Sequence, residues 1–140
     1  MGLEGDANHD DLLVGKRVLT VEDEGITQMQ LAKILKAAGM VQVGLATNGP
    51  QGVDIALSVR PDLILMDINM PGEFNGLEAA RRILAEYPAC IVMLTAYLDY
   101  VEEARNIGIH GYEIKPLDRM NLLHQMRAAL TRFQAGERLP

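Results

Sequence analysis

Polar side chains that can carry chemistry follow four short apolar runs of this chain. The first run ends in three consecutive acids, and the others end in an aspartate, a threonine and a lysine: Glu22, Asp23 and Glu24, then Asp67, Thr95 and Lys115. A carboxylate can act as the nucleophile toward a phosphoryl group, and a hydroxyl or an ammonium group can donate hydrogen bonds to phosphoryl oxygens. These side-chain types suit phosphoryl transfer if the fold brings the ends of the four apolar runs together.

The acids among these residues would repel one another at close range. Two like charges about 4 Å apart cost about 1 kcal/mol in water and about 4 kcal/mol at an effective dielectric of about 20. A cation, a bound proton or open solvent offsets such repulsion. Oxygen ligands at a solvent-open edge suit Mg²⁺ or Mn²⁺, so the acidic triplet and Asp67 could hold such an ion, with the backbone carbonyl of Asn69 as a further ligand. The alternative for the acidic triplet is that it favours the dipole of a following helix.

Composition and charge argue against several classes of function. The 140 residues suffice for one domain, and 49% hydrophobic with 23% charged residues is typical of a soluble globular protein. A net charge of −6 argues against nucleic acid as the main partner, because phosphate binding needs clustered cations. No apolar run is long enough to span a membrane, and the N-terminus lacks a secretory pattern. The single Cys90 fits a reducing compartment, so we predict a cytoplasmic protein without direct nucleic-acid or membrane contact.

Five apolar runs predict the strands that position these side chains. They cover residues 17–21, 41–46, 63–66, 91–94 and 111–114. Continuous apolar runs of this length are typical of strands covered on both faces, and segments with helical spacing follow them. The pattern predicts an α/β fold, a doubly wound five-stranded parallel sheet built from five strand–helix units. In such sheets ligands bind outside the carboxyl ends of the strands, so the polar residues should converge at one edge.

The two ends of the chain differ from the alternating region between them. Residues 1–15 hold four acids and no lysine or arginine, which predicts an acidic, flexible arm. The alternating region covers residues 16–133 and is the predicted domain. Residues 134–140 are predicted to be a fraying tail or the start of a linker.

Four motifs in this order resemble those of response-regulator receiver domains, the phosphoacceptor modules of two-component signalling. The matching segments are Val21-Glu22-Asp23-Glu24, Met66-Asp67-Ile68-Asn69-Met70-Pro71-Gly72, Leu94-Thr95-Ala96-Tyr97 and Gly111-Tyr112-Glu113-Ile114-Lys115-Pro116. The resemblance covers residues 16–133 and implies the flavodoxin-like strand order 2-1-3-4-5.

The resemblance implies a role for each acid of the site. Asp67 would be the phosphorylation site, receiving its phosphoryl group from a sensor histidine kinase or a phosphotransfer protein. Asp23 would bind Mg²⁺ directly, Glu22 would do so mainly through water, and Asn69 would contribute its carbonyl. The domain would then be a signalling module that catalyses only its own phosphorylation and dephosphorylation.

The resemblance also implies how phosphorylation changes the conformation of the domain and which face binds a partner. Thr95 would move toward the phosphoryl group and Tyr112 would turn inward after it, while Lys115 would contact the phosphoryl group and form a cis bond to Pro116. The implied partner-binding face comprises the helix at 99–107, the strand at 111–114 and the last helix. Its candidate surface residues are Val101, Arg105, Ile109, Tyr112 and Asp118.

Two features depart from the commoner family pattern or vary within it. Four residues, 72–75, separate Pro71 from Gly76 where three are usual, so Phe74 either contacts a partner or packs locally. Tyr97 lies two residues after the threonine, and we hypothesise that it shields the phosphoryl group from water.

Three other functions remain possible interpretations of this sequence. A phosphohydrolase with an aspartyl phosphate would need a second aspartate where Asn69 stands, and more chain. A receiver-like binding module without phosphorylation typically lacks an acid, the nucleophile or the lysine, which are all present here. A flavin-binding module would need a phosphate-binding loop after the first strand, and that segment is acidic instead.

Overall fold

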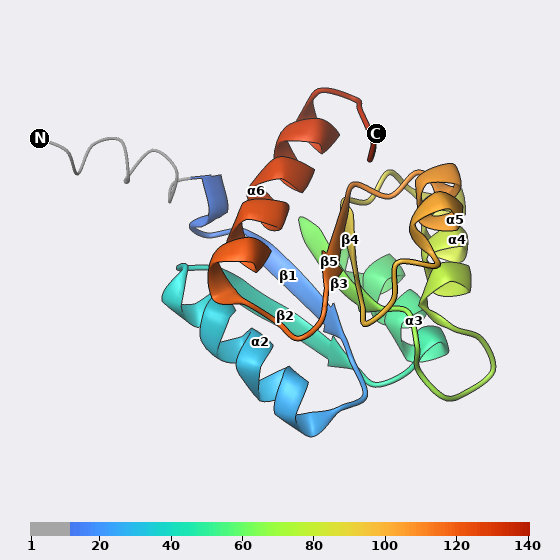
Figure 1. Ribbon diagram of the computed structural model, residues 1–140, viewed down its shortest axis with the longest axis horizontal. Helices are drawn as coiled ribbons and strands as arrows, with labels where there is room; N and C mark the ends of the chain where they lie inside the picture. The colour runs from blue at the N-terminus through green and yellow to red at the C-terminus, as the bar shows by residue number, and fades with distance from the viewer. Residues whose placement is uncertain (1–11) are drawn as a thin grey trace, which may run out of the picture.

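A computed structural model describes residues 12–140, which form a five-stranded parallel sheet between two layers of helices (Figure 1). The strands are β1 (Arg17–Val21), β2 (Val41–Ala46), β3 (Leu63–Asp67), β4 (Ile91–Thr95) and β5 (Gly111–Ile114). The helices are α2 (Gly25–Ala37), α3 (Gly49–Val59), α4 (Gly76–Glu86), α5 (Val101–Ile107) and α6 (Arg119–Gln134). The strand order is β2-β1-β3-β4-β5, so the predicted fold class and strand order are confirmed. Within residues 12–140, every helix is too short or too polar to cross a membrane.

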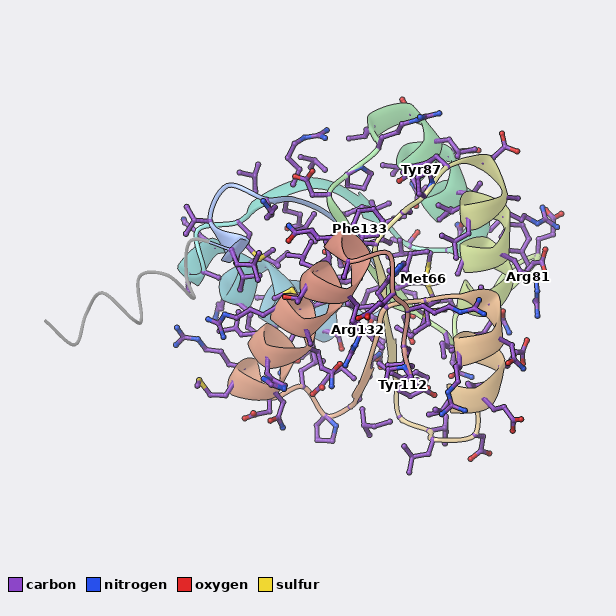
Figure 2. The ribbon with its side chains drawn as sticks, turned by 90° about the horizontal axis from the view of Figure 1, so that it is seen from above. Met66, Arg81, Tyr87, Tyr112, Arg132 and Phe133 are labelled. Carbon is purple, nitrogen blue, oxygen red and sulfur yellow. The ribbon has the colours of Figure 1, made fainter. Side chains whose placement is uncertain are left out.

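Each face of the sheet packs against its own set of helices. Helices α2 and α6 cover one face, and α3, α4 and α5 cover the other (Figure 1). Neighbouring residues of β3 alternate between the two cores. Leu65 belongs to the core that includes residues of α2 and α6, and Met66, labelled in Figure 2, belongs to the core on the other face. All five residues of β3 and of β4 are buried. Burial on both faces explains why the strand sequences are continuously apolar.

In three of the loops that follow strands, a polar side chain caps the first turn of the next helix. Asn48 accepts a hydrogen bond from the Gln51 amide at 2.8 Å. Asn75 accepts one from Glu78 at 3.1 Å, and Asp118 accepts one from Asn121 at 3.0 Å. A side chain in this position satisfies an amide that the first turn of a helix leaves unpaired. These caps fix where α3, α4 and α6 start, and so the length of the loops at the carboxyl edge of the sheet.

Both ends of the described chain pack against the domain. Leu13 is 1% exposed in the core beneath α2 and α6, so the boundary predicted after residue 15 falls inside the packed region. Residues 1–11 of the predicted arm lie outside the described residues. At the other end, the Leu139 amide donates to the Ile109 carbonyl at 2.8 Å, and Arg105 Nε donates to the Pro140 carbonyl at 2.8 Å. The segment predicted to fray therefore returns to α5 and to the loop between α5 and β5.

Candidate functional site

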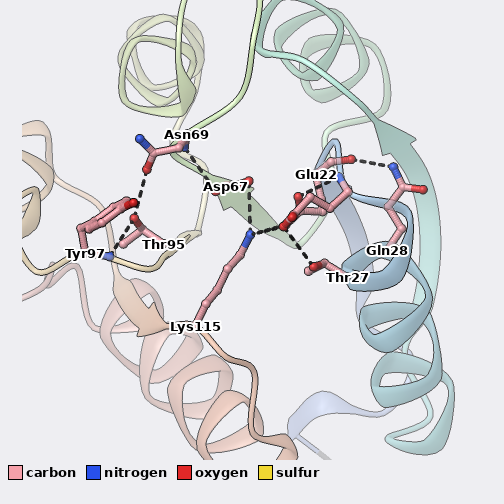
Figure 3. Close-up of polar contacts among 9 residues, drawn as sticks. Glu22, Thr27, Gln28, Asp67, Asn69, Thr95, Tyr97 and Lys115 are labelled. Carbon is pink, nitrogen blue, oxygen red and sulfur yellow. Dashed lines mark hydrogen bonds and ion pairs between the residues drawn. The ribbon is translucent and has the colours of Figure 1, made fainter.

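The register of the parallel strands brings the polar residues at the strand ends to one edge of the sheet (Figure 3). Val21 pairs with Met66, which sets Glu22 beside Asp67. Asp67 pairs with Leu94, the residue before Thr95, and Thr95 pairs with Ile114, the residue before Lys115. The predicted convergence therefore follows directly from strand pairing.

Three carboxylates form the acidic part of the site. Oxygen atoms of Glu22, Asp23 and Asp67 all lie within 4.8 Å of one another. Glu22 is fully buried, Asp67 is 2% exposed, and Oδ1 of Asp23 is buried with no hydrogen-bond partner among residues 12–140. A buried carboxylate oxygen without a partner is costly unless a cation or a donor satisfies it. The carboxylate oxygens, including the unpaired atom of Asp23, are the kind of ligands that a hard divalent cation prefers.

Lys115 supplies a positive charge within this cluster. Its Nζ lies 2.8 Å from Glu22 Oε1, 3.3 Å from Asp67 Oδ2 and 3.4 Å from Glu24 Oε1. Burial alone would lower the pKa of Lys115, but its hydrogen bonds with Glu22 and Asp67 and their negative charges raise it above its usual value. The ammonium group therefore stays charged and offsets part of the carboxylate repulsion.

The Asp67 carboxyl group titrates far from its usual range. Burial is the largest cause, and the negative charge of Glu22 adds to it, so the pKa rises from 3.8 to about 7 although Lys115 pulls it down. A further cation beside Asp67 would lower this pKa, because an opposite charge favours the ionised form. The protein on its own therefore holds Asp67 close to the point at which it gains or loses a proton at neutral pH.

Asn69 and Thr95 form a hydrogen-bonded pair next to Asp67. The Asn69 amide N–H donates to Asp67 Oδ1 at 3.2 Å, and Thr95 Oγ1 donates to Asn69 Oδ1 at 3.2 Å. The Tyr97 amide donates to Thr95 Oγ1 at 3.2 Å. The Thr95 hydroxyl is thus held toward Asn69 in this structure (Figure 3).

The two residues of the predicted switch are connected through the backbone of Tyr97. Tyr112 is 9% exposed, and its hydroxyl donates to the Tyr97 carbonyl at 2.6 Å. Because the Tyr97 amide bonds Thr95, one residue joins the two side chains. Tyr97 itself is 55% exposed and borders an open pocket of about 270 Å³. The residues that line this pocket are Asp23, Glu24, Asp67, Asn69, Ala96, Tyr97 and Lys115.

The acidic triplet does not act as a set of helix-capping side chains. The Glu24 side chain makes no cap hydrogen bond to α2, and the first turn of α2 contains no acid. The Glu22 carboxylate instead accepts hydrogen bonds from Lys115 and from the Glu24 amide. A residue that sequence reasoning missed, Gln28, donates to the Glu22 carbonyl at 2.7 Å and ties α2 to the end of β1.

The longer loop packs locally. Phe74 lies partly buried against the core, with the Arg82 guanidinium group 4.0 Å above its ring. A Cβ atom at Gly49 would come within 2.8 Å of the ring, so α3 can approach the loop only because residue 49 is glycine. Of the two alternatives for Phe74, local packing is the one that the structure shows.

Two further expectations concern the strand β5 region. The Lys115–Pro116 peptide bond is cis, as the resemblance implies. Ile109, in contrast, was wrongly expected at the surface, since its side chain is fully buried in the core under α4 and α5. Tyr112 was also wrongly expected at the surface, because only 9% of it is exposed. Val101 is partly buried, and Arg105 and Asp118 are exposed.

Comparison with known proteins identifies the family. The family model described as response regulator receiver domain matches residues 18–127. The chain belongs to the response regulator receiver domain family. It is 37% identical over 134 residues to the transcriptional regulatory protein PdtaR of Mycobacterium tuberculosis, which covers 94% of this chain and 65% of PdtaR. It is 35% identical over 106 residues to the chemotaxis protein CheY of Thermotoga maritima, covering 74% of this chain and 88% of CheY.

Solved receiver structures share the fold. The response regulator domain of Thermotoga maritima CheB superimposes with a TM-score of 0.78 at 30% identity, covering 84% of this chain and 97% of that one. The signal receiver domain of a modulated diguanylate cyclase from Desulfovibrio desulfuricans G20 gives 0.80 at 28% identity, covering 88% and 99%. The chain thus spans less than two thirds of the length of PdtaR, 65%, and nearly all of the two solved receiver domains.

Proposed function

We propose that Asp67 accepts a phosphoryl group from a phosphohistidine on a sensor histidine kinase or a phosphotransfer protein, in a reaction that requires Mg²⁺. The observation that carries the proposal is the meeting of the buried carboxylates of Glu22 and Asp67 with the Lys115 ammonium group. Membership of the receiver family makes this chain a signalling domain, and the residues of the site supply the reactive groups.

The metal would bind to the acids at the carboxyl edge of the sheet. Glu22, Asp23 and Asp67 provide the carboxylates, and the backbone carbonyl of Asn69 lies in the loop directly after Asp67. The unpaired Oδ1 of Asp23 supports this ligand set, because it is a buried oxygen that lacks a donor within residues 12–140. When bound, Mg²⁺ offsets negative charge on the phosphoryl oxygens.

The chain's own groups perform the transfer. An Asp67 carboxylate oxygen forms a bond to phosphorus while the phosphorus–nitrogen bond of the phosphohistidine breaks, and the electron pair of that bond returns to the imidazole. Lys115 donates from its ammonium group to phosphoryl oxygens, and Thr95 donates from its hydroxyl. Asp67 must be ionised to attack, and neighbouring positive charge favours that form.

The transferred group changes the balance between two arrangements of the domain. The phosphoryl group carries about −1.5 to −2 charge in place of the single charge of the ionised carboxylate, and it brings several acceptor oxygens, which favours Thr95 turned toward the site. The Thr95–Tyr97–Tyr112 connection links that turn to β5. The partner-binding face would then be α5, β5 and α6, and the phosphoryl group would shift its population toward the binding-competent arrangement.

Intact-protein mass after incubation with acetyl phosphate tests the proposal. We expect one added phosphoryl group that requires Mg²⁺, disappears in Asp67→Asn and persists in Asp54→Asn, an exposed acid of α3. A wild-type protein that binds Mg²⁺ but forms no adduct, even with rapid quenching, would favour a binding module without phosphorylation.

Three features of the proposal extend beyond this site. We infer a protein partner downstream rather than direct contact with nucleic acid, on the basis of the acidic net charge of −6. We place the domain in the cytoplasm, where the kinase and the single buried thiol of Cys90 would both fit. We also infer that it turns over no substrate of its own.

A further inference from the structure

Tyr100 contacts the site although no motif includes it. It is the last residue before α5, and its ring packs partly buried against the core beneath that helix. Its hydroxyl oxygen accepts a hydrogen bond from Asn69 Nδ2 at 3.2 Å. The contact joins the loop after β4 to the loop after β3, across 31 positions of the sequence.

The Asn69 side chain is thereby held at both ends. Its Nδ2 donates to Tyr100, and its Oδ1 accepts from the Thr95 hydroxyl at 3.2 Å. The Asn69 backbone is fixed separately, because its amide donates to Asp67 Oδ1. The side-chain amide is therefore the part of Asn69 that can pivot, and Tyr100 limits that pivot.

The Thr95 hydroxyl has one proton to donate. In this structure that proton goes to Asn69, so Thr95 can donate to a phosphoryl oxygen only after the bond to Asn69 breaks. Whatever holds the Asn69 amide in place also favours the arrangement in which Thr95 is turned away from the phosphoryl position.

We propose that Tyr100 is a positioning residue that holds the Asn69 amide as the acceptor for Thr95 and so opposes the turn of Thr95 toward the phosphoryl group. This inference rests on the proposed phosphoacceptor function and adds a residue that sets how readily the switch responds. Removing the Tyr100 hydroxyl frees the amide, weakens the Thr95–Asn69 bond and favours the phosphoryl-bound arrangement.

Titration with beryllofluoride, which mimics a phosphoryl group on a carboxylate, tests this proposal at saturating Mg²⁺. One neutral hydrogen bond changes an equilibrium by roughly two- to tenfold. We expect Tyr100→Phe to lower the apparent Kd by about that factor, and Asn69→Ala to abolish the effect of Tyr100→Phe. Tyr87→Phe is the matched control, since it removes a buried tyrosine hydroxyl that has no hydrogen-bond partner in residues 12–140, and it should leave the Kd unchanged.

A second measurement needs neither metal nor beryllofluoride. In the metal-free protein, Tyr100→Phe should shift the NMR signals of the Asn69 side-chain amide, while the thermal midpoint stays within the range of the control. An unchanged Kd, or a lowered Kd that persists in the Asn69→Ala background, would overturn the role of Tyr100. If the wild-type protein bound no beryllofluoride, the proposed function would fail, and an unmoved Asn69 signal would then separately refute the Tyr100 contact.

Discussion

Lys115 is the counter-ion of a group of carboxylates that includes the fully buried Glu22. Removing one partner of a buried ion pair leaves an uncompensated charge and typically costs about 3–5 kcal/mol. We therefore expect Lys115→Ala to lower the free energy of unfolding of the metal-free protein by about this amount at pH 8, as measured with urea. Arg81→Ala is the control, because its ion pairs with Glu78 and Glu103 are about half exposed and such pairs are worth about 0–1 kcal/mol. Similar losses in both variants would contradict this account of Lys115.

The raised pKa of Asp67 makes the stability of the metal-free protein depend on pH. The pKa of the Asp67 carboxyl is 3.8 in the unfolded chain and about 7 in the folded protein. Between these two pH values the folded state binds more protons than the unfolded state, so the free energy of unfolding falls as the pH rises. Asp67→Asn removes this cost. We expect the variant to be more stable than the wild type at pH 8 by at least about 1 kcal/mol, the free energy of one pKa unit. The gain should shrink toward pH 4.

Urea unfolding in the presence of a chelator, repeated at several pH values, measures this gain. Asp54→Asn, an exposed substitution on α3, should change stability little at any of them. A gain from Asp67→Asn that stayed constant with pH would show that the carboxyl is not titrating in this range.

Tyr97 is exposed and borders the pocket that Asp67 also lines, and our hypothesis is that its ring limits the access of water to that pocket. Tyr97→Ala opens that side while leaving the backbone bonds to Thr95 and Tyr112 in place. We expect the aspartyl phosphate to hydrolyse several-fold faster in the variant, followed by mass after removal of the phosphodonor. A variant that loses its phosphoryl group no faster than wild type would refute the shielding hypothesis.

Sequence reasoning at the level of single residues succeeded where strand pairing alone decides the geometry. Glu22, Asp67, Thr95 and Lys115 end strands that are neighbours in a parallel sheet, so their type and position sufficed to bring them together. Tyr100 was not found, because its contact with Asn69 depends on the path of two loops rather than on any periodic pattern.

The start of α4 lies unusually close to the end of β3. The Gly76 amide donates to the Ile68 carbonyl at 2.9 Å, and a Cβ atom on Gly76 would collide with the Asp67 carbonyl oxygen. We expect Gly76→Ala to destabilise the domain by about 1–3 kcal/mol, the usual cost of overpacking, and to displace the end of the strand that carries Asp67. Gly25→Ala, at the start of α2, is the control because a Cβ there meets nothing within 4 Å.

Thermal or urea unfolding of the two glycine variants checks this expectation. Gly25→Ala should be neutral or slightly stabilising, because alanine reduces the freedom of the unfolded chain. Equal stability of Gly76→Ala and wild type would mean that α4 can move away from β3 at little cost.

The strands were predictable because each is a short apolar run buried on both faces. The boundaries of β1, β2 and β5 agree with the predicted runs, and β3 and β4 extend by the one polar residue that enters the site. The packed ends were less predictable. Leu13 sits in an acidic segment, and Leu139 in a short polar one, so neither shows the periodicity that would reveal burial.

Metal binding should stabilise the whole domain, because a ligand that binds only the folded state shifts the unfolding equilibrium. At about one hundred times its Kd, Mg²⁺ should add about 2.7 kcal/mol to the free energy of unfolding, and a chelator should reverse the gain. Asp23→Asn should remove most of it, whereas Asp54→Asn should not. A gain that survives Asp23→Asn would show that the cation binds elsewhere.

The order in which the site is assembled follows from where its charges lie in the chain. The acids come from the ends of β1 and β3, but Lys115 follows Asp67 by 48 positions, at the end of the last strand. A ribosome therefore makes the acidic cluster well before it makes the ammonium group that balances it. Until β5 has been synthesised, only protons and dissolved cations can neutralise the carboxylates at the ends of β1 and β3. We therefore expect the ionic composition around the nascent chain to influence how early β1 and β3 can pair.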